Sequence, residues 1–114
     1  MKSVISNITN AIEKIIDKGG DAQRKIVVYP YGEIGIRTVE ILRNVYQIEP
    51  LAIFDNYKCQ YNNRIKSFKE ITQYINKQPY IIIATTNREL CQKFKEECLL
   101  YFLLSWSLLS CVTF

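Results

Sequence analysis

The sequence contains no histidine, so it lacks the most common general base and the most common zinc ligand of proteins. Its four cysteines form no C-x-x-C pair, and we therefore assign no metal ligand. The G-x-S-x-G motif, the Walker lysine motif and the Y-x-x-x-K pair are also absent. We assign no catalytic residue and do not expect this chain to catalyse a reaction alone.

Blocks of like charge are also lacking. The net charge is +4, but the lysines and arginines are interspersed with acidic residues along helix-like stretches. This distribution does not favour a nucleic-acid partner. Lys2 is followed by an amphipathic stretch and not by the continuous apolar run of a signal peptide, so we expect a cytoplasmic protein whose cysteines are free, buried thiols.

A length of 114 residues and an apolar share of 48% fit one globular domain over 1–114. Isoleucines at helical spacing predict an amphipathic N-terminal helix within 1–20, which ends at Gly19-Gly20. The segment 25–97 alternates strand and helix patterns and is predicted to be a βαβ core. An apolar C-terminal segment, 98–114, follows it.

Three short apolar runs, 26–29, 51–54 and 80–84, predict buried parallel strands. Helical periodicity fills the first interval, and two capping-box patterns, Ser67 to Glu70 and Thr86 to Glu89, predict helix starts around the third strand. Right-handed crossovers would order the strands 3-2-1 or 2-1-3. The predicted fold class is α/β, a Rossmann-like three-layer sandwich with a mainly parallel sheet, preceded by the amphipathic helix.

The sixteen residues from Leu99 to Phe114 carry no charge, and four serine or threonine residues interrupt the run. It is shorter than the about 20 apolar residues that span a membrane. A buried helix or strand, with a place in a subunit interface, is the favoured interpretation. A membrane-associated tail and the end of a shortened larger protein are the alternatives. With the amphipathic N-terminal helix, this segment predicts a homo-oligomer.

The turn Pro30-Tyr31-Gly32-Glu33-Ile34-Gly35 matches the dinucleotide fingerprint G-x-G-x-x-G at its second and third glycines only. Gly32 would let a phosphate approach the backbone, and Gly35 would let the helix lie close to its strand. Pro30 removes one amide donor at this turn. Glu33 adds a negative charge that opposes a pyrophosphate.

Further candidate ligand-binding residues follow the strands. Tyr31 could stack on a base or sugar, and Asp55 lies 23 positions after Gly32, where a ribose-binding acid occurs in such units. Asn56, next to Asp55, is a further candidate ligand-binding residue. The alternative is that Asp55-Asn56 only turns the chain. Thr85 and Thr86 offer hydroxyl groups at the end of the third strand, although Thr86 also suits a helix cap.

On the stretches Ile26 to Gly35, Ile53 to Asn56 and Ile81 to Thr85, the chain resembles the Rossmann-like subdomains that accompany bacterial surface-polysaccharide enzymes, among them sugar O-acyltransferases and FkbM-type methyltransferases. The resemblance covers about Lys25 to Glu97. It implies that such a domain positions a nucleotide-sugar near Gly32 and Asp55. The left-handed β-helix of the acyltransferases and any methyltransferase domain are absent.

The sequence therefore predicts a nucleotide- or nucleotide-sugar-binding module of polysaccharide biosynthesis, tied, if it belongs to an enzyme system, to a sugar transferase or sugar-modifying transferase. The alternative is a non-catalytic interaction or oligomerisation domain with a vestigial nucleotide site. Fold class alone does not decide between them. The predicted ligand is a nucleotide or nucleotide-sugar, without a metal.

Overall fold

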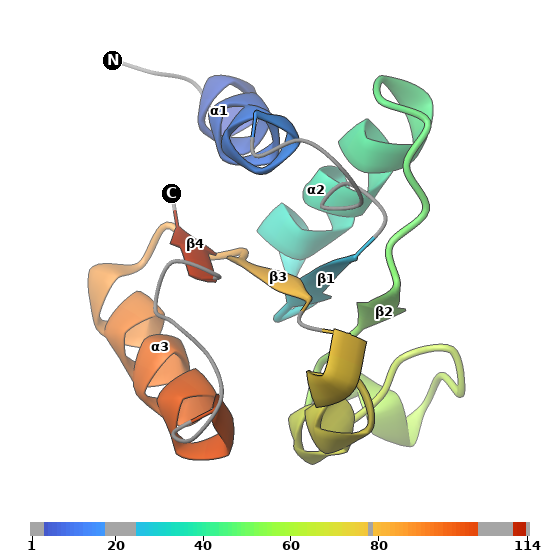
Figure 1. Ribbon diagram of the computed structural model, residues 1–114, viewed down its shortest axis with the longest axis vertical. Coiled ribbons are helices and arrows are strands. Elements are labelled where there is room, and N and C mark those ends of the chain that lie inside the picture. The colour runs from blue at the N-terminus through green and yellow to red at the C-terminus, as the bar shows by residue number, and fades with distance from the viewer. Residues whose placement is uncertain (1–3, 18–24, 78, 103–110, 114) are drawn as a thin grey trace.

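A computed structural model describes residues 4–17, 25–77, 79–102 and 111–113 of the chain. The protein is a compact α/β fold with a parallel sheet and helices on both of its faces (Figure 1). The strands are β1 (Ile26–Tyr29), β2 (Ala52–Ile53), β3 (Tyr80–Ile83) and β4 (Cys111–Thr113). The α-helices within these ranges are α1 (Val4–Ile16), α2 (Glu33–Asn44) and α3 (Arg88–Phe102).

The sheet has the order β2-β1-β3-β4, and every neighbouring pair is parallel. The first three strands lie within the predicted runs, although β2 is only two residues long, and 2-1-3 was one of the two predicted orders. Val27 pairs with Ala52 on one side and with Ile81 on the other. β1 is thus a central strand, which explains its run of four buried apolar residues.

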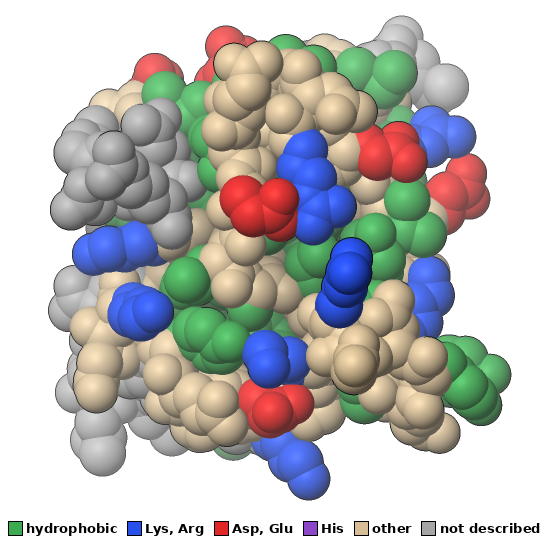
Figure 2. All heavy atoms as spheres, turned by 90° about the vertical axis from the view of Figure 1, so that its right-hand side faces the viewer, with side chains coloured by type: hydrophobic (Ala, Val, Ile, Leu, Met, Phe, Trp, Pro, Cys, Tyr) green, Lys and Arg blue, Asp and Glu red, His purple; other side chains and the backbone are tan. Residues whose placement is uncertain are grey.

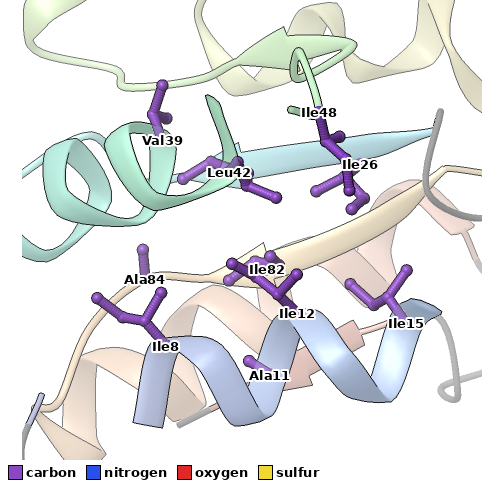
Figure 3. Packing of buried hydrophobic residues seen from close by; sticks show 11 residues of the cluster. Ile8, Ala11, Ile12, Ile15, Ile26, Val39, Leu42, Ile48, Ile82 and Ala84 are labelled. Carbon is purple, nitrogen blue, oxygen red and sulfur yellow. The ribbon is translucent and has the colours of Figure 1, made fainter. Parts of the chain in front are cut away.

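Alternate residues of β1 and β3 contribute to separate cores on opposite faces of the sheet. Ile26, Val28 and Ile82 pack with α1 and α2, whereas Val27 and Ile81 pack with the segments that follow β2 and β3. Figure 3 shows Ile26 and Ile82 among the residues of the first core. In Figure 3, Ile8, Ile12 and Ile15 of α1 point toward the sheet and α2. The helix predicted before the core is therefore part of one of the two cores.

The connection from β2 to β3 differs from the prediction. Ser67 does begin a helical segment, with its amide donating to Glu70 Oε2 at 3.2 Å, but the segment forms the 3₁₀ helices η3 (Phe68–Gln73) and η4 (Ile75–Lys77). The buried residues of η3, Phe68 and Ile71, are three positions apart. That spacing places them on one side of a 3₁₀ helix and of an α-helix alike, so it is compatible with the 3₁₀ form but does not require it.

The C-terminal segment lies partly outside the described residues. α3 extends to Phe102, beyond the predicted end of the core, and Cys111–Thr113 forms β4 beside β3. This part of the segment is therefore an edge strand of the sheet. Residues 103–110 and 114 are outside the described range. Among the described helices, none has the length and apolarity needed to cross a membrane.

Candidate functional site

Parallel strands end at one edge of the sheet, and the predicted ligand-binding residues follow these ends. Tyr31 and Gly32 come after β1, Asp55 after β2, and Thr85 after β3. Because β1 lies between β2 and β3, the loop after β1 is flanked by the other two. The hydrogen bonds of the described residues join the first two loops but do not join Thr85 to either.

The carboxylate of Asp55 is the link between these two loops. Its Oδ2 accepts a hydrogen bond from the Tyr31 amide at 3.0 Å, and its Oδ1 accepts from the amides of Tyr57 at 2.9 Å and Lys58 at 2.8 Å. The two local bonds are those of an Asx turn, as the chain-turning interpretation requires. The bond to Tyr31 spans 24 positions and fixes the glycine turn against the end of β2.

Asp55 is 8% exposed, and a carboxylate offers about four acceptor positions, of which the backbone takes three. These three bonds are sufficient to explain Asp55 as a structural residue that holds the turn after β1 and the loop after β2 together. A ribose hydroxyl would find one acceptor position left on Oδ2. The sequence pointed to the acid itself, but the pairing with Tyr31 depends on how the strands are placed in space.

Lys58 is a site residue that the sequence did not single out. Its ammonium nitrogen donates to the Tyr31 carbonyl at 2.6 Å and lies 5.2 Å from the centre of the Tyr31 ring. A cation at this distance from an aromatic face is attracted to the ring. Asp55 and Lys58 thus hold the backbone amide and the carbonyl of Tyr31, directly before Gly32. Only the position of Lys58 three residues after Asp55 could have suggested it.

The two glycines of the turn have different surroundings. A Cβ added to Gly35 would overlap the Pro30 carbonyl oxygen, so this glycine allows α2 to pack against its own preceding turn. A Cβ added to Gly32 would have no heavy atom within 4 Å, and Gly32 has φ −84°, which any residue adopts. Packing explains Gly35, whereas nothing in the described structure requires a glycine at position 32.

Glu33, the first residue of α2, points into solvent, with its side chain 79% exposed. Its Oε1 lies 3.2 Å from the guanidinium of Arg37, one helical turn later. This orientation of an i,i+4 pair also suits the helix dipole. The negative charge of Glu33, which the sequence indicates as unfavourable for a bound phosphate, is partly balanced by Arg37.

Asn56 belongs to a second cluster, on the face of the sheet that α3 covers. Its Nδ2 donates to the Tyr29 hydroxyl at 3.2 Å, and its Oδ1 accepts from the Phe68 amide at 2.7 Å. The Tyr29 hydroxyl donates to Glu97 Oε1 at 2.6 Å. Burial and the neighbouring Glu97 raise the pKa of Tyr29, which keeps the phenol neutral. Both polar groups of Asn56 thus have protein partners.

The predicted capping role of Thr86 is wrong. Helix α3 begins at Arg88, and Asn87 is its cap, because Asn87 Oδ1 accepts from the Leu90 amide at 3.1 Å. The Thr85 hydroxyl accepts from the Asn87 amide at 3.2 Å. Thr86 is exposed.

Two further features are the cysteines, of which Cys59 directly follows Lys58, and a groove beside α1 and α2. Cys98 is buried as predicted, but Cys59 and Cys91 are only partly buried, and none of these three described cysteines forms a disulfide. A groove of about 220 Å³ is lined by Ile5 of α1 and by residues of α2, namely Arg37, Glu40 and Ile41. None of the predicted site residues lines it.

Comparison with known protein families, with curated proteins and with solved structures gave no match. We therefore infer what the site can bind from its geometry alone. The edge offers backbone amides at the start of α2, a cation at Lys58, the Tyr31 ring and an open position at Gly32. These groups can bind an anion and a planar ring, but they include no pair of groups placed for acid–base catalysis.

Proposed function

We propose that the protein is a Rossmann-like, cytoplasmic module that binds a nucleotide or nucleotide-sugar at the carboxyl edge of its sheet, in the service of surface-polysaccharide biosynthesis. The observation that carries the proposal is the contrast between the two glycines. Gly35 is needed by the fold, whereas the space around Gly32 is open and its backbone unstrained. The fold therefore does not explain the glycine at position 32. A bound phosphate would explain it, because the absence of a side chain lets a phosphate approach the backbone closely.

The surroundings of Gly32 support an anionic ligand. The first amides of α2 lack intrahelical partners, and Lys58 lies beside the carbonyl that precedes Gly32. Glu33 is directed to solvent and paired with Arg37. In this proposal Asp55 and Lys58 hold the turn in shape, and Tyr31, Gly32 and the α2 amides contact the ligand.

The test is calorimetric titration with NAD, UDP-sugars, GDP-sugars and S-adenosylmethionine, on the native chain and on Gly32→Val. A Cβ at position 32 has room in the protein, and a valine side chain would occupy the space of the phosphate, so binding should fall at least about tenfold. Because Gly32 is the N-cap of α2 and valine is a poor cap, the stability should also fall by about 1 kcal/mol, and circular dichroism checks that the titrated variant is folded. The control is Asn44→Ala, at the exposed far end of α2, which should bind as the native chain does. Equal binding by Gly32→Val, or none to any ligand, would contradict the proposal.

The second candidate is an interaction or oligomerisation domain with a vestigial nucleotide site. The bonding of Asp55 favours it, because three backbone amides already occupy the carboxylate. Light scattering distinguishes the two candidates. An oligomer at micromolar concentration, in a protein that binds none of the nucleotides, would favour the interaction domain.

A further inference from the structure

The loop of residues 56–67, which follows β2, is closed on itself. At its base the Asp55 amide donates to the Lys66 carbonyl at 2.9 Å, and the Phe68 amide donates to Asn56 Oδ1 at 2.7 Å. Its interior turns are fixed by the bonds from Tyr61 and Asn62 to the Lys58 carbonyl, both 3.0 Å. Compact loops of this length with joined ends are often functional.

This loop carries positive charge without any acidic residue. Its cations are Lys58, Arg64 and Lys66, and Lys69 follows directly in η3. The nearest acids, Asp55 and Glu70, flank the loop, and against the four cations they leave residues 55–70 with a net charge of +2. Figure 2 agrees, because basic side chains predominate in the lower half of that face, at the height of this loop in Figure 1. The charges that are scattered along the sequence are therefore locally unbalanced here.

Two large aromatic side chains are exposed on the same loop. Tyr57 is 66% and Tyr61 73% exposed, and their ring centres are 5.4 Å apart. The ring planes are tilted by 57° to each other, and most of each side chain is exposed to solvent. Solvated tyrosines beside cations are the combination that binds single-stranded nucleic acid, in which bases stack on rings and phosphates meet lysine and arginine.

We propose that loop 56–67 binds single-stranded nucleic acid through Tyr57, Tyr61 and its basic side chains. The charge complementarity selects a polyanion, and the exposed rings select one with unpaired planar bases over a duplex or a sulfated polysaccharide. The proposal goes beyond the nucleotide site and does not rest on it. The bases stack on the tyrosine pair, while Arg64 and Lys69, both exposed, contact the phosphates.

Fluorescence anisotropy with a labelled oligothymidylate and oligouridylate of about 12 nucleotides tests the proposal. Tyr57→Leu/Tyr61→Leu should weaken binding about tenfold or more, because the bases can no longer stack on the two rings. Arg64→Gln/Lys69→Gln should lower the slope of log affinity against log salt by about 0.7 for each phosphate that the protein no longer neutralises. The matched control, Lys14→Gln/Lys93→Gln, removes the same charge from exposed positions on α1 and α3 and should leave the slope unchanged.

Circular dichroism of each variant shows whether the fold persists, and the substitutions at exposed positions should preserve it. Duplex DNA and dextran sulfate serve as competitors without accessible bases, and they should displace the oligonucleotide poorly. Three results would overturn the proposal. These are no binding at low salt, an equal decrease in the control variant, or oligonucleotide binding that folded Tyr57→Leu/Tyr61→Leu retains in full.

Discussion

Tyr29 shows at the scale of one residue how a buried polar group joins separate elements. Its ring stacks on Phe68 with centres 4.2 Å apart, and its hydroxyl meets Glu97 of α3 and Asn56 of the loop after β2. It is 2% exposed. A neutral phenol can satisfy both a carboxylate and an amide donor, and a charged one cannot.

Because of Tyr29, the free energy of unfolding should decrease as the pH becomes alkaline. The pKa of Tyr29 is raised in the folded protein, whereas an unfolded tyrosine titrates near about 10. The stabilisation is therefore complete below about pH 10 and is lost as the pH rises further, by up to about 1.4 kcal/mol per pH unit. Urea unfolding between about pH 8 and pH 11 measures the decline.

Tyr29→Phe should lower the free energy of unfolding at neutral pH by about 1–2 kcal/mol, because it removes the hydroxyl that bonds Glu97 and Asn56. It should also flatten the alkaline decline. Tyr61→Phe is the control, because it removes a tyrosine hydroxyl from an exposed side chain. An equally steep decline in Tyr29→Phe would show that another group is responsible.

The start of α3 tests the assignment of a helix cap at the scale of an element. Asn87→Ala removes the side-chain acceptor of the Leu90 amide and should destabilise the protein by about 1 kcal/mol. Thr86→Ala, one residue earlier, should change the stability by only a few tenths of a kcal/mol. Thermal or urea unfolding of the two variants provides the measurement. A larger loss in Thr86→Ala would restore the cap expected from the sequence.

The same contrast shows what the sequence could predict about elements. Thr86 and Asn87 are both good caps, and the choice depends on where β3 ends and α3 can begin. Ser67 and Glu70 indicated a helix start, but the spacing of Phe68 and Ile71 suits an α-helix and a 3₁₀ helix alike, so the sequence did not predict the 3₁₀ form. The strands 26–29 and 80–84 were predictable because β-branched apolar runs suit a sheet that is buried on both faces.

The candidate site was less predictable, because its contacts join distant segments. The carboxylate at position 55 could be found from its place after an apolar run, but its bond to the Tyr31 amide could not. Lys58 carries no motif, and its contact with the Tyr31 ring exists only when β1 and β2 are neighbours. The edge strand β4 was one alternative for an uncharged segment whose composition does not distinguish strand from helix.

For the whole molecule, the position of α1 decides whether the N-terminal helix belongs to the fold or to an interface. Ile8, Ile12 and Ile15 are fully buried against α2 and the sheet within one chain (Figure 3). Ile12→Ala should therefore destabilise the protein by about 2–5 kcal/mol, because it removes buried apolar surface and leaves a cavity. Ile5 lies on the same helix but is 57% exposed, so Ile5→Ala is the matched control and should lower the free energy of unfolding far less.

Urea unfolding at several protein concentrations separates the two roles of α1. If α1 packs on its own chain, the penalty of Ile12→Ala is the same at every concentration, because no association is broken. If α1 instead joined two copies, the penalty would shrink on dilution, where the native protein would also lose its partner. A concentration-independent penalty in Ile12→Ala, with a small one in Ile5→Ala, places the helix in the core of the single chain. An oligomer would then have to form through another surface.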